Sequence, residues 1–198
     1  ASGAIYLEVD KACNADGVVD EAFKASFADA LDVFIDRYAS LRVDGARVDV
    51  ANDYTVRVFL PAKMDSEYVA INRFSHIGEL KIRAGSSETT AQDVFKLRAG
   101  ESISDYVKEV KSGVMNNTSY VEFRFTDKGT AAMSTATSSA ADSSITMYFY
   151  VGDSAVISLS VSEQFTESSF YISGGYSTET AAIVAKLFDT AIHSPADA

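Results

Sequence analysis

The chain has 198 residues, 47% hydrophobic and 23% charged, which is ordinary globular composition with room for one large or two small domains. Its formal net charge of −11 argues against nucleic acid and anionic membrane surfaces as partners, because both polyanions recruit lysine and arginine. No run approaches the ~20 apolar residues of a membrane span, and there is no signal-peptide pattern. A single cysteine, Cys13, rules out an internal disulfide.

The first part of the chain predicts a ferredoxin-like unit. Its long helix carries large apolar residues on one face, and its strands alternate polar and apolar positions. The expected elements are a strand (4–9), a helix (18–41), a hairpin (47–50 and 55–60, turning at Asn52-Asp53), a helix capped by Asp65 that runs to about Ser75, and a strand (79–83). This β-α-β-β-α-β order is typical of the split βαβ fold.

The middle of the chain is less regular. Residues 85–90 are small and polar and predict an exposed loop, residues 93–97 favour a short strand, and residues 103–111 favour a short helix. Ser112-Gly113 and Asn116-Asn117 then interrupt the periodicity. We therefore expect two lobes, 1–112 and 113–198, with the ferredoxin-like core at 4–83.

The last third predicts strand, helix, hairpin, strand and helix. Residues 120–125 alternate with period two, and Asp127 is a suitable N-cap for the helix after them. Residues 145–151 and 155–161 form the hairpin, and Gly174-Gly175 turns the chain toward a helix capped by Ser177. The expected fold class is α+β, a ferredoxin-like lobe followed by a lobe with a mixed or antiparallel sheet.

No arrangement of residues suits catalysis, a cofactor or a metal. His76 is expected at a helix end and His193 in the terminal tail, so the two histidines form neither a metal site nor a base–nucleophile pair. The segment 10–20 (DKACNADGVVD) lacks the spacing of a calcium loop, and an acidic helix start explains it better. We expect a protein that is not an enzyme.

Aromatic residues crowd the second lobe, and alternation requires some of them to face away from the core. Such side chains offer a large contact area at low entropic cost and suit docking of an unfolded or extended chain. In a two-layer lobe the same residues are instead buried beneath a helix and the first lobe. The candidate contact residues are Tyr148, Tyr150, Phe165 and Tyr171.

Several segments, in the same order, resemble the first large extracytoplasmic domain of the SecD (SecDF) protein-export family. That family shows a strand followed by D-x-x-G-A, a hairpin similar to I-V-L-D-G-x-V-I-S-A-P, and I-S-G-x-F-T-x-E-x-A before a helix. The matching segments here are 126–131 (TDKGTA), 150–158 (YVGDSAVIS) and 172–181 (ISGGYSTETA), with looser matches at 34–38 (FIDRY), 54–61 (YTVRVFLP) and 77–83 (IGELKIR). The hairpin's D-G is rearranged to Gly-Asp, as in a divergent member.

The resemblance implies a head-and-base domain of a membrane protein, exposed outside the cytoplasm between membrane helices absent from these 198 residues. Its partners would be unfolded preprotein, contacted by the aromatic residues named above, and the Sec translocon and a SecF-like subunit, reached through the membrane part. It also implies a mobile head, for which the candidate hinge residues are Ser112, Gly113, Asn116 and Asn117. Considered alone, the same residues favour an ordinary surface loop.

Two other classes of function remain open on the sequence. A ferredoxin-like sheet also suits a small-molecule-binding regulatory module, which a defined apolar pocket would favour. A secreted surface-interaction protein is the other alternative, and a native gene without flanking membrane helices would favour it.

Overall fold

Antiparallel sheets and four helical segments make up the part of the chain that the computed structural model describes, residues 3–8, 13, 15, 17–41, 46–52, 54–60 and 73–193. The strands are β1 (Gly3–Glu8), β2 (Arg47–Asn52), β3 (Thr55–Leu60), β4 (Leu80–Gly85), β5 (Gln92–Asp93), β6 (Val107–Met115), β7 (Thr118–Phe125), β8 (Ile145–Val151), β9 (Ser154–Val161) and β10 (Ser169–Ser173). The helices are α1 (Glu21–Ala39), α3 (Asp127–Ala136), α4 (Thr178–Ala191) and the short 3₁₀ turn η1 (Ile103–Asp105).

The N-terminal lobe consists of β1, α1, β2 and β3. Its strand order is β1-β3-β2, and β3 runs antiparallel to both neighbours, which is the split βαβ arrangement expected from the sequence. The last strand of the ferredoxin-like prediction does not join this sheet. Most of the helix expected from Asp65 lies outside the described residues, and the strand expected at 79–83 is formed as β4 but joins the other lobe, where it pairs with β8.

The C-terminal lobe contains β4 to β10, α3 and α4. It has two antiparallel sheets, ordered β10-β7-β6 and β5-β4-β8-β9, so the α+β class is confirmed. The hairpin of β8 and β9 forms as predicted, with a bulge between Phe149 and Tyr150. Ser177 caps α4 by accepting from the amide of Thr180 at 3.0 Å. The cap of α3 is Thr126 rather than the predicted Asp127, which is the first residue of the helix.

The helix predicted over 103–111 is wrong. Only the 3₁₀ turn η1 is helical there, and β6 follows it. A bulge where β6 pairs with β7 shifts the alternation between Val107 and Glu109, so Val107 and Val110 are both buried. Two buried residues three positions apart imitate the spacing of a helix, and only the pairing with β7 distinguishes the two structures.

The interruption at 112–118 is a tight hairpin. Ser112 and Gly113 lie within β6, opposite Val121 and Tyr120 of β7. Asn116 and Asn117 form the two-residue turn with φ of 51° and 59°, the conformation that asparagine tolerates in a type I′ turn. Bending at these residues would break pairs within one sheet, so the structure places the candidate hinge residues inside the C-terminal lobe, and the expected boundary at 112/113 falls within β6.

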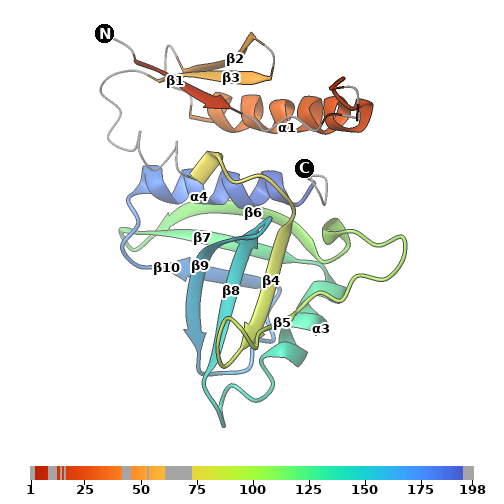
Figure 1. Cartoon of the computed structure of the whole chain (residues 1–198). Coiled ribbons are helices and arrows are strands. Elements are labelled where there is room, and N and C mark those ends of the chain that lie inside the picture. Colours follow the sequence, from red (N-terminus) through yellow and green to blue (C-terminus); the bar gives the residue numbers. More distant parts are fainter. Residues whose placement is uncertain are drawn as a thin grey trace.

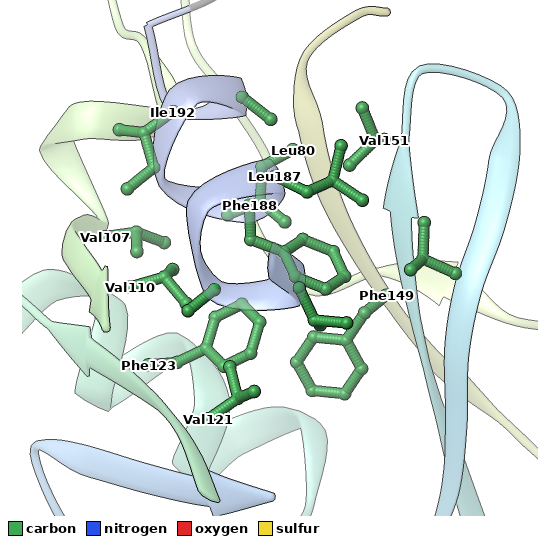
Figure 2. Packing of buried hydrophobic residues seen from close by; sticks show 14 of the residues in the cluster. Leu80, Val107, Val110, Val121, Phe123, Phe149, Val151, Leu187, Phe188 and Ile192 are labelled. Carbon is green, nitrogen blue, oxygen red and sulfur yellow. The ribbon is translucent and has the colours of Figure 1, made fainter. Parts of the chain in front are cut away.

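The core of the C-terminal lobe lies between its two sheets and α4. Phe123 of β7, Phe149 of β8 and Phe188 of α4 meet at its centre (Figure 2), with ring centroids 4.9 to 6.4 Å apart. Edge-to-face aromatic pairs of this kind contribute about 0.5–1.5 kcal/mol each beyond area burial. Because α4 supplies one of the three rings, it is an integral part of this lobe.

The N-terminal lobe rests on the outer side of α4. Figure 1 shows the sheet of β1, β2 and β3 above α1, and α1 above α4, which in turn covers the sheet of β6 and β7. The lobes therefore meet helix against helix. No strand pairs across this junction among the described residues.

Candidate functional site at the junction of the lobes

Arg37, in the last turn of α1, is the polar centre of the junction. Its side chain is fully buried, and its Nε donates to Thr190 Oγ1 of α4 at 2.8 Å. Its Nη1 donates to the carbonyl oxygens of Phe74 and His76 at 2.9 and 2.6 Å. One guanidinium group thus joins α1, α4 and the segment that leads to β4, a use of its fixed fork of donors that lysine could not reproduce.

The surroundings of Arg37 alter its protonation chemistry. Burial lowers the pKa of Arg37 to about 10, and the neighbouring Tyr38 and Asp36 oppose that shift. The pKa of His76 is also lowered, first by burial and then by the positive charges of Arg73 and Arg37. Arg37 therefore stays charged at neutral pH while His76 is held neutral.

A second polar contact crosses the same junction. Lys186 Nζ of α4 lies 2.9 Å from Asp36 Oδ2 of α1. Because the Asp36 side chain remains largely exposed, we expect this pair to contribute at most about 1 kcal/mol. The exposed side of α1 at Asp36 therefore reaches α4.

The segment 73–79 fastens the junction to the β8–β9 hairpin. Arg73 Nη1 donates to the carbonyl oxygen of Val156 at 3.5 Å, and the amide of Gly152 donates to the carbonyl of Glu79 at 3.0 Å. Gly78, at φ +121°, lies so close to Gly152 that a Cβ on Gly78 would stand 2.5 Å from the Gly152 Cα. A Cβ on Gly152 would likewise collide with the carbonyl oxygen of Ile77, so the close approach of these two segments requires glycine at both positions.

A groove opens beside the junction. It has a volume of about 260 Å³ and runs between β6 and α4, with Ser40 and Leu41, just beyond α1, at one side. Apolar side chains of Val110, Ala182 and Ile183 line its interior, and charged groups of both signs lie around it. Its three walls come from both lobes.

The four aromatic residues proposed as contacts are not gathered together. Tyr171 is 51% exposed and packs edge-to-face against Tyr120 with ring centroids 5.3 Å apart. Tyr150 is only 7% exposed, and its hydroxyl donates to Glu88 Oε1 at 2.8 Å. Phe165 packs at the edge of the core against Phe125 and Phe170, and Tyr148 is half-buried. Tyr171 is thus the one of the four with a largely exposed ring.

The sequence reasoning missed Arg37 as a junction residue. The signal was available, because Arg37 lies between Phe34 and Tyr38 on the apolar side of α1, where a charged residue needs a polar partner. Its partners Thr190 and the carbonyl of Phe74 lie far away in the chain and could not be paired with it from spacing. Among the described residues, no group of three or more His, Cys, Asp or Glu side chains is placed to hold a metal ion.

The fold and the junction define the class of protein: a two-lobed α+β domain in which a smaller lobe packs on helix α4 of the larger one. Comparison with known protein families identifies the family within this class, because the model of the SecDF P1 head subdomain matches residues 86–191, just over half of the chain. The chain therefore belongs to the SecDF family. The SecDF resemblance stated from the sequence is confirmed.

Solved structures agree on the fold across both lobes. A crystal structure of SecDF in its super-membrane-facing form is similar over 98% of this chain, with a TM-score of 0.60 and 13% identity, and this chain covers 29% of that protein. A second structure, from work on SecDF as a membrane component that enhances protein export, is similar over 97% of this chain and 96% of that chain, with a TM-score of 0.54 and 15% identity. No curated protein matches the sequence. Within the described residues, no helix has the length and apolar character needed to cross a membrane.

Proposed function

We propose that this chain is the extracytoplasmic domain of a SecD-like subunit that assists protein export by contacting an emerging unfolded preprotein. The observation that carries the proposal is the family match of the C-terminal lobe, together with structural similarity to SecDF that extends over the N-terminal lobe. The Sec translocon and a SecF-like subunit would be reached through a membrane part outside these 198 residues.

We further propose that the two lobes change orientation during the export cycle. The hydrogen bonds of Arg37 and the Lys186–Asp36 pair bridge the lobes, and no sheet continues from one lobe to the other within the described residues. Such contacts can break and re-form as rigid bodies rotate, whereas a shared sheet would resist rotation. We therefore place the movement at this junction, in preference to Ser112–Asn117.

We propose that the preprotein contacts exposed side chains on the C-terminal lobe. Met115, at the end of β6, is 60% exposed, and Tyr171 lies two strands away on the same face of this sheet. Large apolar side chains left in solvent are suited to transient contacts with an unfolded chain. The expected contacts at Tyr150 and Phe165 have less support, because their rings are largely used inside the lobe.

The apolar groove of the N-terminal lobe gives little support to a small-molecule-binding module. The apolar groove between α1 and β3, lined by Phe23, Phe27, Leu31 and Phe34 among others, has a volume of about 160 Å³. Sites for drug-sized ligands usually measure about 300–1,000 Å³. This groove is therefore too small for such a ligand.

Site-specific crosslinking tests the proposed contact with preprotein. A photo-reactive amino acid at Tyr171 of the complete membrane subunit should crosslink to a stalled export intermediate, and the same group at Asp142, exposed beyond α3, should crosslink much less. Equal crosslinking at both positions, or none at either, would contradict the proposed contact.

Distance measurements test the lobe movement independently. The exposed Cys13 and a Ser138→Cys substitution place one spin label near each lobe, because the chain has no other cysteine. Arg37→Ala should broaden this distance distribution. A control pair within the C-terminal lobe, Ser138→Cys with Ser160→Cys in a Cys13→Ser background, should be unaffected. Identical narrow distributions for the Cys13–Ser138→Cys pair before and after Arg37→Ala would contradict a mobile junction.

A further inference from the structure

The outer edge of β6 offers main-chain groups that no strand of the described residues occupies. Met115 and Thr118 flank the two-residue turn, so Met115, Gly113, Lys111 and Glu109 direct their main-chain groups toward β7. The alternate residues Val110, Ser112 and Val114 must then direct their amides and carbonyls outward. The amide of Val110 does point outward, because it donates a hydrogen bond to Asp189 Oδ1 of α4 at 2.9 Å.

Asp189 occupies the first outward-facing position of this edge, where it accepts a hydrogen bond from the Val110 amide. Its carboxylate takes the position that a carbonyl oxygen of a neighbouring strand would hold beside Val110. Beyond Val110 the edge borders the 260 Å³ groove at Ser112, and it ends past the groove at the exposed side chains of Val114 and Met115. The first pairing position is thus filled by a side chain, while no strand of the described residues pairs with the following ones.

The groove has the shape that strand addition requires. It is bounded by a strand edge on one side and by α4 on the other, and the helix presents the small Ala182 and Ala185 together with Ile183. Peptides that add a strand beside a helix obtain affinity from main-chain hydrogen bonds and from pockets for alternate side chains. Narrow helix residues leave room for such a chain.

We propose that this groove binds an extended segment of the unfolded polypeptide, added as a strand along Ser112–Val114. The inference rests on the proposed function and names the place and manner of binding. Main-chain pairing depends little on the side chains of the bound segment, as an exporter of many sequences needs. The groove is lined by charged residues of both signs, so neither sign of charge in the segment is rejected; they are Lys111, Lys186, Glu179 and Asp189.

A second copy of the chain is a poorer occupant. Edge-to-edge pairing of two β6 strands would bring α4 of each copy against the other, because α4 lines the groove along that edge. A single extended segment avoids this collision. Self-association that depends on Ala182 is therefore an outcome that would overturn the proposal.

The third wall connects binding to lobe orientation. Ser40 and Leu41 follow α1 of the N-terminal lobe, and both line the groove. Rotation of α1 against α4 would move this wall while β6 and α4 remain in place. The bound segment would therefore be gripped in one lobe orientation and released in another.

The test is a binding titration with the 198-residue chain and a short fluorescein-labelled peptide of alternating valine and threonine. Ala182→Trp fills the groove from an exposed position on α4, and Ala131→Trp, at an exposed position on α3 outside the groove, is the matched control. We expect Ala182→Trp to weaken binding by about tenfold or more and Ala131→Trp to leave it unchanged. Thermal melts of both variants establish that they are folded.

A second peptide distinguishes strand addition from non-specific hydrophobic binding. It has the same side chains but carries N-methyl groups on alternate amides, which removes the donors that pair with a strand edge. We expect it to bind about tenfold more weakly than its parent. If peptide binds but ignores both Ala182→Trp and N-methylation, the groove proposal fails while preprotein binding stands. If no peptide binds, the groove proposal fails, and the Tyr171 crosslink decides the proposed function separately.

Discussion

Arg37 carries a full charge into the buried junction of the lobes. Among the described residues its partners are a hydroxyl and two carbonyl oxygens, whose charge-assisted hydrogen bonds offset part of the lost hydration, while its buried Nη2 has no partner there. The arrangement is directional, since the guanidinium plane must face the Phe74–His76 segment and α4 together. Small changes in lobe orientation therefore alter several bonds at once.

Replacing Arg37 tests this arrangement. Arg37→Ala orphans the buried carbonyls of Phe74 and His76, and we expect the free energy of unfolding to fall by about 3 kcal/mol. Urea denaturation measures the change, and Arg98→Ala, at an exposed position, should alter stability by less than about 0.5 kcal/mol. Equal effects of the two substitutions would show that the Arg37 bonds contribute little.

Glu101 is the residue through which acid should act on the C-terminal lobe. Its pKa is lowered to about 2 by Lys128, by the amide of Arg98 and by the hydroxyl of Tyr106. A carboxylate with a depressed pKa stabilises the fold fully above its ordinary pKa, near 4.5, and loses that contribution as pH falls toward 2. These bonds connect the 98–106 segment to α3, so acid should loosen that connection first.

Glu101→Gln should therefore flatten the dependence of stability on pH. We expect the urea midpoint of the native chain to fall more steeply between about pH 4.5 and 2 than that of the variant, because the amide cannot titrate. The exposed Glu167→Gln is the matched control and should follow the native curve. Parallel curves for the native chain and Glu101→Gln would refute the assignment.

At the scale of the elements, the segment before β4 packs directly against the backbone of the β8–β9 turn, with Gly78 next to Gly152. The IGELKIR segment reaches β4 by passing Gly152 of the β8–β9 turn, where two main chains touch without intervening side chains. The same approach occurs at Gly129 of α3, where a Cβ would collide with the carbonyl of Tyr106. Glycine is needed at these positions for close packing of elements.

Two glycine substitutions distinguish the cost of a steric collision from the cost of backbone strain at a positive φ. Gly174→Ala, at φ +110° with open space around it, should cost about 1–2 kcal/mol from the left-handed conformation alone. Gly78→Ala carries a similar strain and adds the collision with Gly152, so we expect a further loss of about 2 kcal/mol or more. Thermal unfolding compares them, and equal losses would mean that the two segments separate at little cost.

At the scale of the whole molecule, most of the buried apolar residues that the structure describes lie in the C-terminal lobe. Among the described residues, the N-terminal lobe buries Phe34, Tyr38, Val56, Val58 and Leu60, whereas the C-terminal lobe surrounds β7 and β8 with the larger share of buried apolar residues. Local stability follows the density of such contacts. The N-terminal lobe should therefore open at lower free energy than the lobe it rests on.

Native-state hydrogen exchange measures this difference. Amides of β7 and β8 should exchange most slowly, and those of β2 and β3 faster, with Arg37→Ala accelerating exchange in β2 and β3 but not in β8. Uniform protection across both lobes, changed equally by the substitution, would show that the chain opens as one cooperative unit.

Local chemistry in the sequence was sufficient for many elements. Alternation predicted β7, and β-branched and aromatic runs on either side of a short turn predicted β8 and β9. The cap at Ser177 with the apolar spacing after it predicted α4. These signals all involve residues close together in the chain. The order of family-like segments in the sequence also indicated the SecDF family, and the family match confirms it. Each of these features depends on near neighbours, whose geometry a short stretch of sequence specifies.

Only the tertiary structure decided which elements associate. The strand at β4 could have completed the N-terminal sheet, yet it pairs with β8, and the Val107–Val110 spacing became a strand because β7 was available to accept a bulged partner. Arg37 became a junction residue through Thr190, 153 positions away. Pairing, burial and lobe contact depend on free energies summed over distant residues, so periodicity within a single element cannot determine them.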